Sequence, residues 1–316
     1  MTYVLLLLGF ALLIKGADYF VEGSSSIASL LKVPPILVGL TIVAFGTSSP
    51  EATVSIIAAL EGNADVAVGN VVGSNIFNIT FVVGLTAFLN PLKVENATIR
   101  KEIPFTFLGS ITLLVLISDI ALKTSETNII NRSEGLILLL FFAVFMYYIL
   151  EAARNNRTAI TEEAPKDKKW GKYILLTLGG LAAIIFGGDL VVNNSIKIAY
   201  SFGMSETLVG LTIVAIGTSL PELVTSITAA IKKQSEIALG NIVGSNIFNI
   251  LFVLGASSII SPLPVDPKIF IDVFLMILFT IVLFFFTKSE YRIAKSEGII
   301  LAAAYIVYMV FIILRG

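Results

Sequence analysis

Long apolar runs dominate this chain and restrict it to a membrane-spanning fold. Of its 316 residues, 56% are apolar and 14% are charged. Runs of 18 or more mostly apolar residues suffice to cross a hydrocarbon core of roughly 30 Å as helix. We therefore predict an all-α membrane protein with ten transmembrane helices. The expected spans are 3–31, 35–60, 65–90, 103–122, 135–152, 172–199, 206–231, 236–261, 269–287 and 297–314.

Two residue types are missing, and their absence limits the chemistry. The sequence contains no cysteine and no histidine. Disulfides, thiolate ligands and imidazole proton relays are thereby excluded, so an ion site must be built from oxygen atoms. The first apolar run follows Met1-Thr2-Tyr3 without a basic segment or a cleavage motif, and we expect it to be retained as a span.

Basic residues fall mainly in alternate connections between the spans, which predicts the orientation. Cytoplasmic connections of membrane proteins carry an excess of Lys and Arg. We therefore expect a multi-pass protein of the cell (inner) membrane, with its central loop in the cytoplasm and both termini outside. The connections expected inside contain Lys32, Lys93, Arg100, Lys101, Arg154, Arg157, Lys166, Lys168, Lys169, Lys172, Lys232, Lys233, Lys288, Arg292 and Lys295.

The chain also repeats itself across a polar linker at 153–171. The linker separates 1–152 from 172–316, with five expected spans in each half. Because five is odd, the second half enters the membrane from the opposite side, which predicts inverted-topology repeats. The best-matched segments lie within 38–84 and 209–255, and their counterparts are 171 residues apart. They are VGLTIVAFGTSSPE (38–51) with VGLTIVAIGTSLPE (209–222), and GNVVGSNIFNI (69–79) with GNIVGSNIFNI (240–250).

Each repeated motif places a glutamate, Glu51 or Glu222, within an apolar span. A carboxylate at membrane depth needs a partner, a cation or a proton, and neither span contains a Lys or Arg. Inverted symmetry would bring both carboxylates to the midplane, where two like charges repel unless a cation lies between them. A divalent cation would match their charge. The alternatives are protonated structural glutamates and a duplicated scaffold kept only for helix packing.

A break is expected just before each glutamate. Proline removes an amide hydrogen and disfavours helix at the preceding residue, and Pro50 and Pro221 directly precede the glutamates. We predict a new half-helix after each break, with unwound carbonyls around Ala44 to Thr47 facing a cation. The second copy, from Gly217 to Glu222, repeats the arrangement.

Neutral oxygen ligands are expected from the spans that follow. Ser74 and Asn78 are four residues apart, as are Ser245 and Asn249, so each pair lies on one helix face. Hydroxyl and amide oxygens suit hard cations such as calcium and sodium. Four further asparagines are interpreted as bonds between helices, and the recurring Asp18 and Asp189 as helix-end or packing groups. Those asparagines are Asn70, Asn75, Asn241 and Asn246.

The motifs GTSSPE and GTSLPE, each followed by GN(V/I)VGSNIFNI, resemble the two alpha-repeats of the calcium/cation antiporter superfamily, in its prokaryotic sodium/calcium exchanger branch. The resemblance covers nearly the whole chain. It implies alternating access, with Na+ and Ca2+ as the transported ions, no cofactor, and a first and sixth helix that slide across a rigid core.

The resemblance also implies ligands. Calcium would be held by the carboxylates of Glu51 and Glu222 and by the backbone carbonyls of Thr47 and Thr218. Sodium would add Ala44, Ser48, Ser74, Ala215, Ser219 and Ser245, and Asn78 and Asn249 would line the centre. Some relatives have aspartate where this chain has Asn249, which makes potassium co-transport a weaker expectation here. The central loop is too short for the calcium-sensing domains of animal exchangers.

Three other functions were weighed. A proton/calcium exchanger of the same superfamily is the main alternative, although that branch resembles GNxxE at the glutamate. An intramembrane hydrolase using Ser48 or Ser219 would have only the glutamates as base, so an enzyme is not expected. A channel or sensor would not need a duplicated, inverted site. The bilayer and the two ions are the expected partners, with no nucleic acid and no obligate protein partner.

Overall fold

The protein is almost entirely helical. The computed structural model describes residues 1–123, 126–155, 169–203 and 215–315. Most of the predicted linker and the first part of the seventh predicted span, including the start of the 209–255 motif, lie outside these residues. The helices of the first half are α1 (Thr2–Leu31), α2 (Pro35–Val38), η1 (Gly39–Val43), α3 (Ala44–Thr47), α4 (Ser49–Leu60), α5 (Ala64–Phe77), η2 (Asn78–Val82), α6 (Val83–Leu89), η3 (Thr98–Glu102), α7 (Ile103–Leu116), α8 (Asp119–Leu122) and α9 (Arg132–Asn155).

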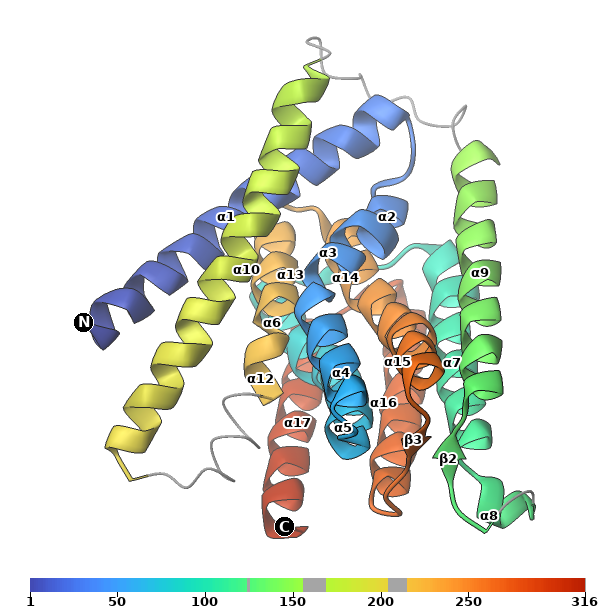
Figure 1. Ribbon diagram of the computed structural model, residues 1–316. Coiled ribbons are helices and arrows are strands. Elements are labelled where there is room, and N and C mark those ends of the chain that lie inside the picture. Colours follow the sequence, from blue (N-terminus) through green and yellow to red (C-terminus); the bar gives the residue numbers. More distant parts are fainter. Residues whose placement is uncertain (124–125, 156–168, 204–214, 316) are drawn as a thin grey trace.

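The second half has a corresponding series of helices (Figure 1). The elements labelled η are π-helical turns, in which the backbone is wound wider than in an α-helix. The helices are α10 (Trp170–Ser201), α12 (Ala215–Thr218), α13 (Leu220–Ile231), α14 (Ser235–Ile247), η5 (Phe248–Val253), α15 (Leu254–Ile260), α16 (Ile269–Glu290) and α17 (Lys295–Arg315).

Seven helices in the described part of the chain are long and apolar enough to cross a membrane. The bent pair Pro35–Thr47 and Ser49–Leu60 gives an eighth if it is counted as one span. The fourth predicted span is shorter than expected, because α7 ends at Leu116 and Asp119 starts the separate turn α8. The count of ten spans therefore stays a prediction.

Two long helices with internal π-turns form the centre of the protein. In the most apolar windows of Ala64–Leu89 and Ser235–Ile260, 78% and 94% of the residues are buried, against 17% to 33% in the other long helices. Asn75 Nδ2 donates to Asn246 O at 3.3 Å, and Asn246 Nδ2 donates to Asn75 O at 3.4 Å. These reciprocal bonds confirm the structural interpretation of these two asparagines.

Four short strands were not expected from the sequence. β1 (Leu92–Lys93) pairs antiparallel with β4 (Arg292–Ile293), and β2 (Ile129–Ile130) pairs antiparallel with β3 (Leu263–Pro264). Each pair joins a connection of the first half to one of the second. Two residues are too few to produce a recognisable alternating pattern, so only the fold reveals them.

The helices α1 and α10 cross each other closely and run obliquely to the rest of the bundle (Figure 1). With 30 and 32 residues, they are about 45 and 48 Å long at 1.5 Å per residue, so a tilt fits both into a bilayer. Glycine permits the close crossing. A Cβ on Gly16 would lie 2.9 Å from Gly180 O, and one on Gly180 would lie 2.5 Å from Phe20 N.

The intramembrane aspartates do have local partners. Asp18 forms an ion pair with Lys232 at 2.7 Å, which links α1 to the end of α13. Asp189 accepts from Asn193 Nδ2 at 2.8 Å. Neither aspartate is joined to the glutamate pair by these bonds, in agreement with the packing interpretation.

Candidate cation site

The span containing Glu51 bends at the predicted position but does not unwind. The axes of Pro35–Thr47 and Ser49–Leu60 differ by 49°, and Ser48 stands between the two helices with φ −81° and ψ 7°. The expectation of free carbonyls from Ala44 to Thr47 is wrong for Ala44. Those residues form a helical turn, and Ala44 O accepts from Ser48 N–H at 3.0 Å. Pro50 lacks a donor only for the carbonyl four residues earlier, so a bend suffices.

The second copy is interrupted at Ser219, with φ −92° and ψ 9°, and its backbone bonding differs slightly from that of the first copy. The amide of Ser219, which separates α12 from α13, donates to Ile216 O at 3.2 Å. The equivalent amide of the first copy donates to Ala44 O, so the two copies differ in which carbonyl the serine amide occupies. Ala215, a predicted ligand, begins α12.

Each glutamate is hydrogen-bonded to the serine of the opposite motif. Ser48 Oγ donates to Glu222 Oε1 at 2.8 Å, and Ser219 Oγ donates to Glu51 Oε1 at 2.8 Å. All four side chains have no exposed surface. Because each serine lies three residues before the glutamate of its own motif, the two bonds hold both bends and both carboxylates at one place.

The serines of the central helices join the same cluster. Ser219 Oγ lies 3.1 Å from Ser74 Oγ. Ser245 Oγ lies 3.4 Å from both Glu222 Oε1 and Ala44 O. The structure therefore brings the four serines that were expected as ligands close to the glutamates. Ser48, Ser74, Ser219 and Ser245 come from four separate spans.

Four oxygen atoms of the two glutamates and of two asparagines on the central helices are buried without a hydrogen-bond partner among the described residues. They are Glu51 Oε2, Glu222 Oε2, Asn78 Oδ1 and Asn249 Oδ1. The amide nitrogen of Asn78 is occupied by Asn246 Oδ1 at 3.1 Å, and that of Asn249 by Asn75 Oδ1 at 3.3 Å. Buried polar atoms are normally paired. Two carboxylate and two amide oxygens without donors therefore form a set of acceptors suited to a hard cation.

Asn70 and Asn241 form the bonds between helices that the sequence predicted, but the serines that they bind beside the glutamates were missed. Asn70 Nδ2 donates to Glu51 O at 3.1 Å and to Ser55 Oγ at 2.9 Å. Asn241 Nδ2 makes the equivalent bonds to Glu222 O at 3.3 Å and to Ser226 Oγ at 2.9 Å. The signal was available, because each of these serines follows its glutamate by four residues, on the same helix face.

The predicted threonines lie beside these asparagines. Thr47 Oγ1 donates to Asn241 Oδ1 at 2.9 Å, and Thr218 Oγ1 lies 3.5 Å from Asn70 Oδ1. Both hydroxyls are thus directed to the asparagines of the opposite half. The ligand role expected of Thr47 and Thr218 concerns their backbone carbonyls, which these hydroxyl bonds do not involve.

The π-turns, also missed, coincide with the central asparagines. η2 begins at Asn78, and η5 contains Asn249. A π-turn inserts one extra residue into a helix and is frequent at functional sites. No sequence signal that we used distinguishes such a turn from α-helix, because both have similar periodicity.

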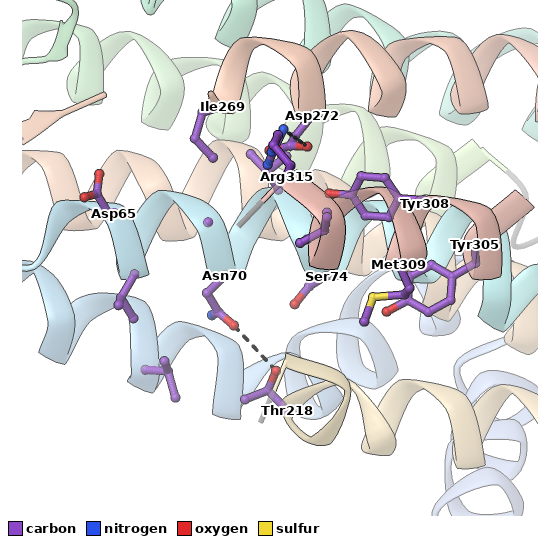
Figure 2. A pocket seen from close by; sticks show the side chains of 16 residues that line it. Asp65, Asn70, Ser74, Thr218, Ile269, Asp272, Tyr305, Tyr308, Met309 and Arg315 are labelled. Atoms are coloured by element: carbon purple, nitrogen blue, oxygen red, sulfur yellow. Dashed lines mark hydrogen bonds and ion pairs between the residues drawn. The ribbon is translucent and has the colours of Figure 1, made fainter. Parts of the chain in front are cut away.

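A cavity of about 440 Å³ reaches this cluster from one side. Asn70, Ser74 and Thr218 line its inner end, and Asp272, Tyr308 and Arg315 line another part of it (Figure 2). Ser74 is hydrogen-bonded to Ser219, and Ser219 is hydrogen-bonded to Glu51. Two hydrogen bonds therefore connect the wall of the cavity to a carboxylate.

Removing one of the cross-motif hydroxyls provides a test of this geometry. If the cluster carries calcium as the sequence predicts, Ser48→Ala should weaken calcium transport about tenfold or more, because a hydrogen bond to a charged group is worth about 1.5–3 kcal/mol. The measurement is initial calcium flux in proteoliposomes. Ser49→Ala is a matched control, since the bond that Ser49 Oγ donates goes to Phe45 O, one turn earlier in the same span. Equal flux in both variants would contradict a role for the Ser48–Glu222 bond.

Comparison with known proteins identifies the family of this chain. The family model described as "Sodium/calcium exchanger protein" matches residues 1–151 and 172–314. The chain is 42% identical over 316 residues to the putative antiporter CaxA of Alkalimonas amylolytica, covering 96% of each chain. It is 32% identical over 341 residues to the sodium/calcium exchanger MaX1 of Methanosarcina acetivorans, covering 98% of this chain and 97% of that one.

Structural and more distant similarities point the same way. The fold matches the sodium-calcium exchanger NCX_Mj, soaked with 10 mM Na+ and no Ca2+, with a TM-score of 0.85 and 31% identity over 98% of each chain. The Ca(2+)/H(+) antiporter ChaA of Bacillus subtilis is 25% identical, covering 75% of this chain and 70% of that one. The chain therefore belongs to the sodium/calcium exchanger family and is a membrane antiporter of cations.

Proposed function

We propose that this protein exchanges Na+ for Ca2+ across the cell membrane, normally extruding calcium as sodium enters. The observation that carries the proposal is a set of four buried oxygens that lack hydrogen-bond partners. They are Oε2 of Glu51 and Glu222 and Oδ1 of Asn78 and Asn249. No Lys or Arg side chain bonds to this cluster among the described residues. The charge of the carboxylates must therefore be met by bound cations or protons.

The proposed ligands combine this cluster with the backbone near the two bends. Calcium would be held by the carboxylates of Glu51 and Glu222, with the carbonyls of Thr47 and Thr218. Sodium ions would use the same groups together with the serine hydroxyls of the cluster and the carbonyl of Ala215, whereas Ala44 O is already bonded to Ser48 N–H. The buried positions of the described side chains support this assignment. Asn78 and Asn249 would line the centre.

Coupling follows from electrostatics. Two carboxylates in a medium of low dielectric constant repel strongly when they are empty. One divalent ion or several monovalent ions neutralise them, and both together would exceed their charge. Alternating access then carries the site from one side to the other only when it is occupied. The transported ions act as substrates, and no cofactor or catalytic group is needed.

We further propose ten spans arranged as two inverted repeats, 1–152 and 172–316, around a cytoplasmic linker. The reciprocal serine–glutamate and asparagine–asparagine bonds support a two-fold relation between the halves. The strand pairs support the predicted orientation. β1 with β4 joins two connections expected inside, and β2 with β3 joins two expected outside. Both termini and the cavity at Arg315 would then face outward, with the protein in the inner membrane.

A proton/calcium exchanger remains the second candidate, because the relative ChaA is named for that activity. Buried carboxylates without a basic partner can also bind protons. The serine and asparagine oxygens around them favour sodium, since a proton needs no additional ligands.

The deciding experiment measures calcium flux in proteoliposomes under separate sodium, proton and potassium gradients, with the membrane potential clamped. We expect an outward-directed sodium gradient alone to drive calcium uptake. Uptake driven by a pH gradient in the absence of sodium would overturn the proposal in favour of proton coupling. Uptake that needs potassium as well as sodium would contradict the interpretation of Asn249, which stands where some relatives have aspartate, as a sign against potassium co-transport.

A further inference from the structure

A second buried carboxylate cavity lies away from the glutamate pair, where α2, η3 and α9 meet. Glu102 is 1% exposed, and its Oε1 accepts a hydrogen bond from the Tyr148 hydroxyl. Its Oε2 is buried without a partner among the described residues, as is the hydroxyl of Thr98 one turn earlier. Glu102 lines a cavity of about 240 Å³ together with Glu95, Lys101, Tyr148 and Asn155.

The second half of the chain has a similar acid, but there it is neutralised. Asp272 is 4% exposed and lies near the start of α16, as Glu102 does near the start of the η3–α7 helix. Arg315 donates to both of its carboxylate oxygens, at 3.0 Å and 2.8 Å (Figure 2). A bidentate pair of this kind satisfies a buried carboxylate fully.

The sequence repeat shows why Glu102 lacks an equivalent partner. In this part of the chain counterparts are 163 residues apart, as Ser133-Glu134-Gly135 and Ser296-Glu297-Gly298 demonstrate. The counterpart of Arg315 at that offset is Ala152, which lines the Glu102 cavity. A methyl group therefore stands where the other half has a guanidinium.

The remaining basic group near Glu102 does not replace that arginine. Lys101 Nζ lies 5.2 Å from the centre of the Tyr148 ring, and no ion pair joins it to Glu102 in the described part of the chain. A buried carboxylate whose Oε2 has no donor is costly, and a cation in the cavity at that oxygen removes the cost.

We propose that this cavity is a second cation site, separate from the transport site, which binds one hard cation through Glu102. Glu95 would supply a second carboxylate at the mouth, and Asn155 and the Tyr148 phenol would supply neutral oxygens. Such a set of oxygen ligands suits Ca2+. It also suits Na+, whose single charge needs fewer carboxylates to neutralise it. The charge pattern of the chain places this cavity on the cytoplasmic side, where the site would sense ions inside the cell.

Terbium luminescence offers a direct test, because Tb3+ binds at calcium sites and is sensitised by a neighbouring tyrosine. The protein would carry Glu51→Gln and Glu222→Gln to silence the central cluster. We expect one saturable Tb3+ signal, displaced by Ca2+ or by Na+, with the two arms identifying the preferred ion. Glu102→Gln should weaken Tb3+ binding about tenfold or more, since a charged ligand is lost.

Two further variants make the result specific. Ala152→Arg should abolish the signal by supplying the cation that Arg315 supplies to Asp272, whereas Asp272→Asn should leave it unchanged. If the doubly substituted background does not fold, the number of bound Ca2+ ions is compared between the native chain and Glu102→Gln, with a loss of one ion expected. No saturable binding, or binding in Glu102→Gln and Ala152→Arg as strong as in the protein without these substitutions, would overturn the site and indicate a protonated Glu102.

Discussion

Sodium-dependent calcium flux should be abolished by Glu51→Gln and, separately, by Glu222→Gln. Each change removes one of two charges while keeping an oxygen that can still accept from Ser219 or Ser48. Removing one partner of a buried charged set costs about 3 kcal/mol or more, which corresponds to about a hundredfold or greater loss of calcium affinity. Flux into proteoliposomes and calcium binding to purified protein measure the two effects.

The chain offers a matched control for this experiment. Glu61 follows the same helix α4 but is exposed, so Glu61→Gln should retain native flux. Thermal unfolding of all three variants checks that they remain folded. Native exchange in either Glu51→Gln or Glu222→Gln would refute the assignment of these carboxylates to the transport site.

Gly244→Ala is expected to have the second large effect. The added methyl group would push the central helix α14 away from the segment that leads into the bend at Ser48. A Cβ on Gly244 would lie 2.7 Å from Leu40 O and 2.8 Å from Ala44 Cβ. The backbone must then move apart, lengthening the contacts of Ser245 with Ala44 O and Glu222. We expect a loss of about 1–3 kcal/mol of stability and a loss of calcium flux of at least about tenfold.

Gly109→Ala in α7 is the control for this substitution. A Cβ there would lie 3.7 Å from the nearest atom, a side-chain carbon of Leu251, which is ordinary contact. Thermal unfolding in detergent and calcium flux in proteoliposomes compare the two variants. If both changes have the same effect, the close approach at Gly244 does not position the site.

The long helices were predictable because length and apolarity alone decide whether a segment crosses a bilayer. The expected span 65–90 corresponds to Ala64–Leu89, and 236–261 to Ser235–Ile260. The helix breaks at Ser48 and Ser219 were also predictable, because proline acts on its own neighbours. Local causes have local signals, and those signals can be read from the sequence.

The form of each bend was not predictable. A missing amide hydrogen is compatible with either an unwound segment or a kinked helix, and packing against α14 decides between them. The observed helical turn at Ala44–Thr47 has Ser245 and Gly244 against it. The same applies to the π-turn at Asn78, which no periodicity reveals.

The sequence by itself determined a helical membrane protein with two copies of one polar motif, because apolar length and repetition are properties of the chain. Tertiary structure alone decided that Ser48 binds Glu222 and Ser219 binds Glu51, rather than each serine binding the glutamate of its own motif. Partners 174 and 168 residues apart are chosen by how helices pack. Packing also left Oε2 of both glutamates and Oδ1 of Asn78 and Asn249 without donors, and the proposed ion site rests on these oxygens.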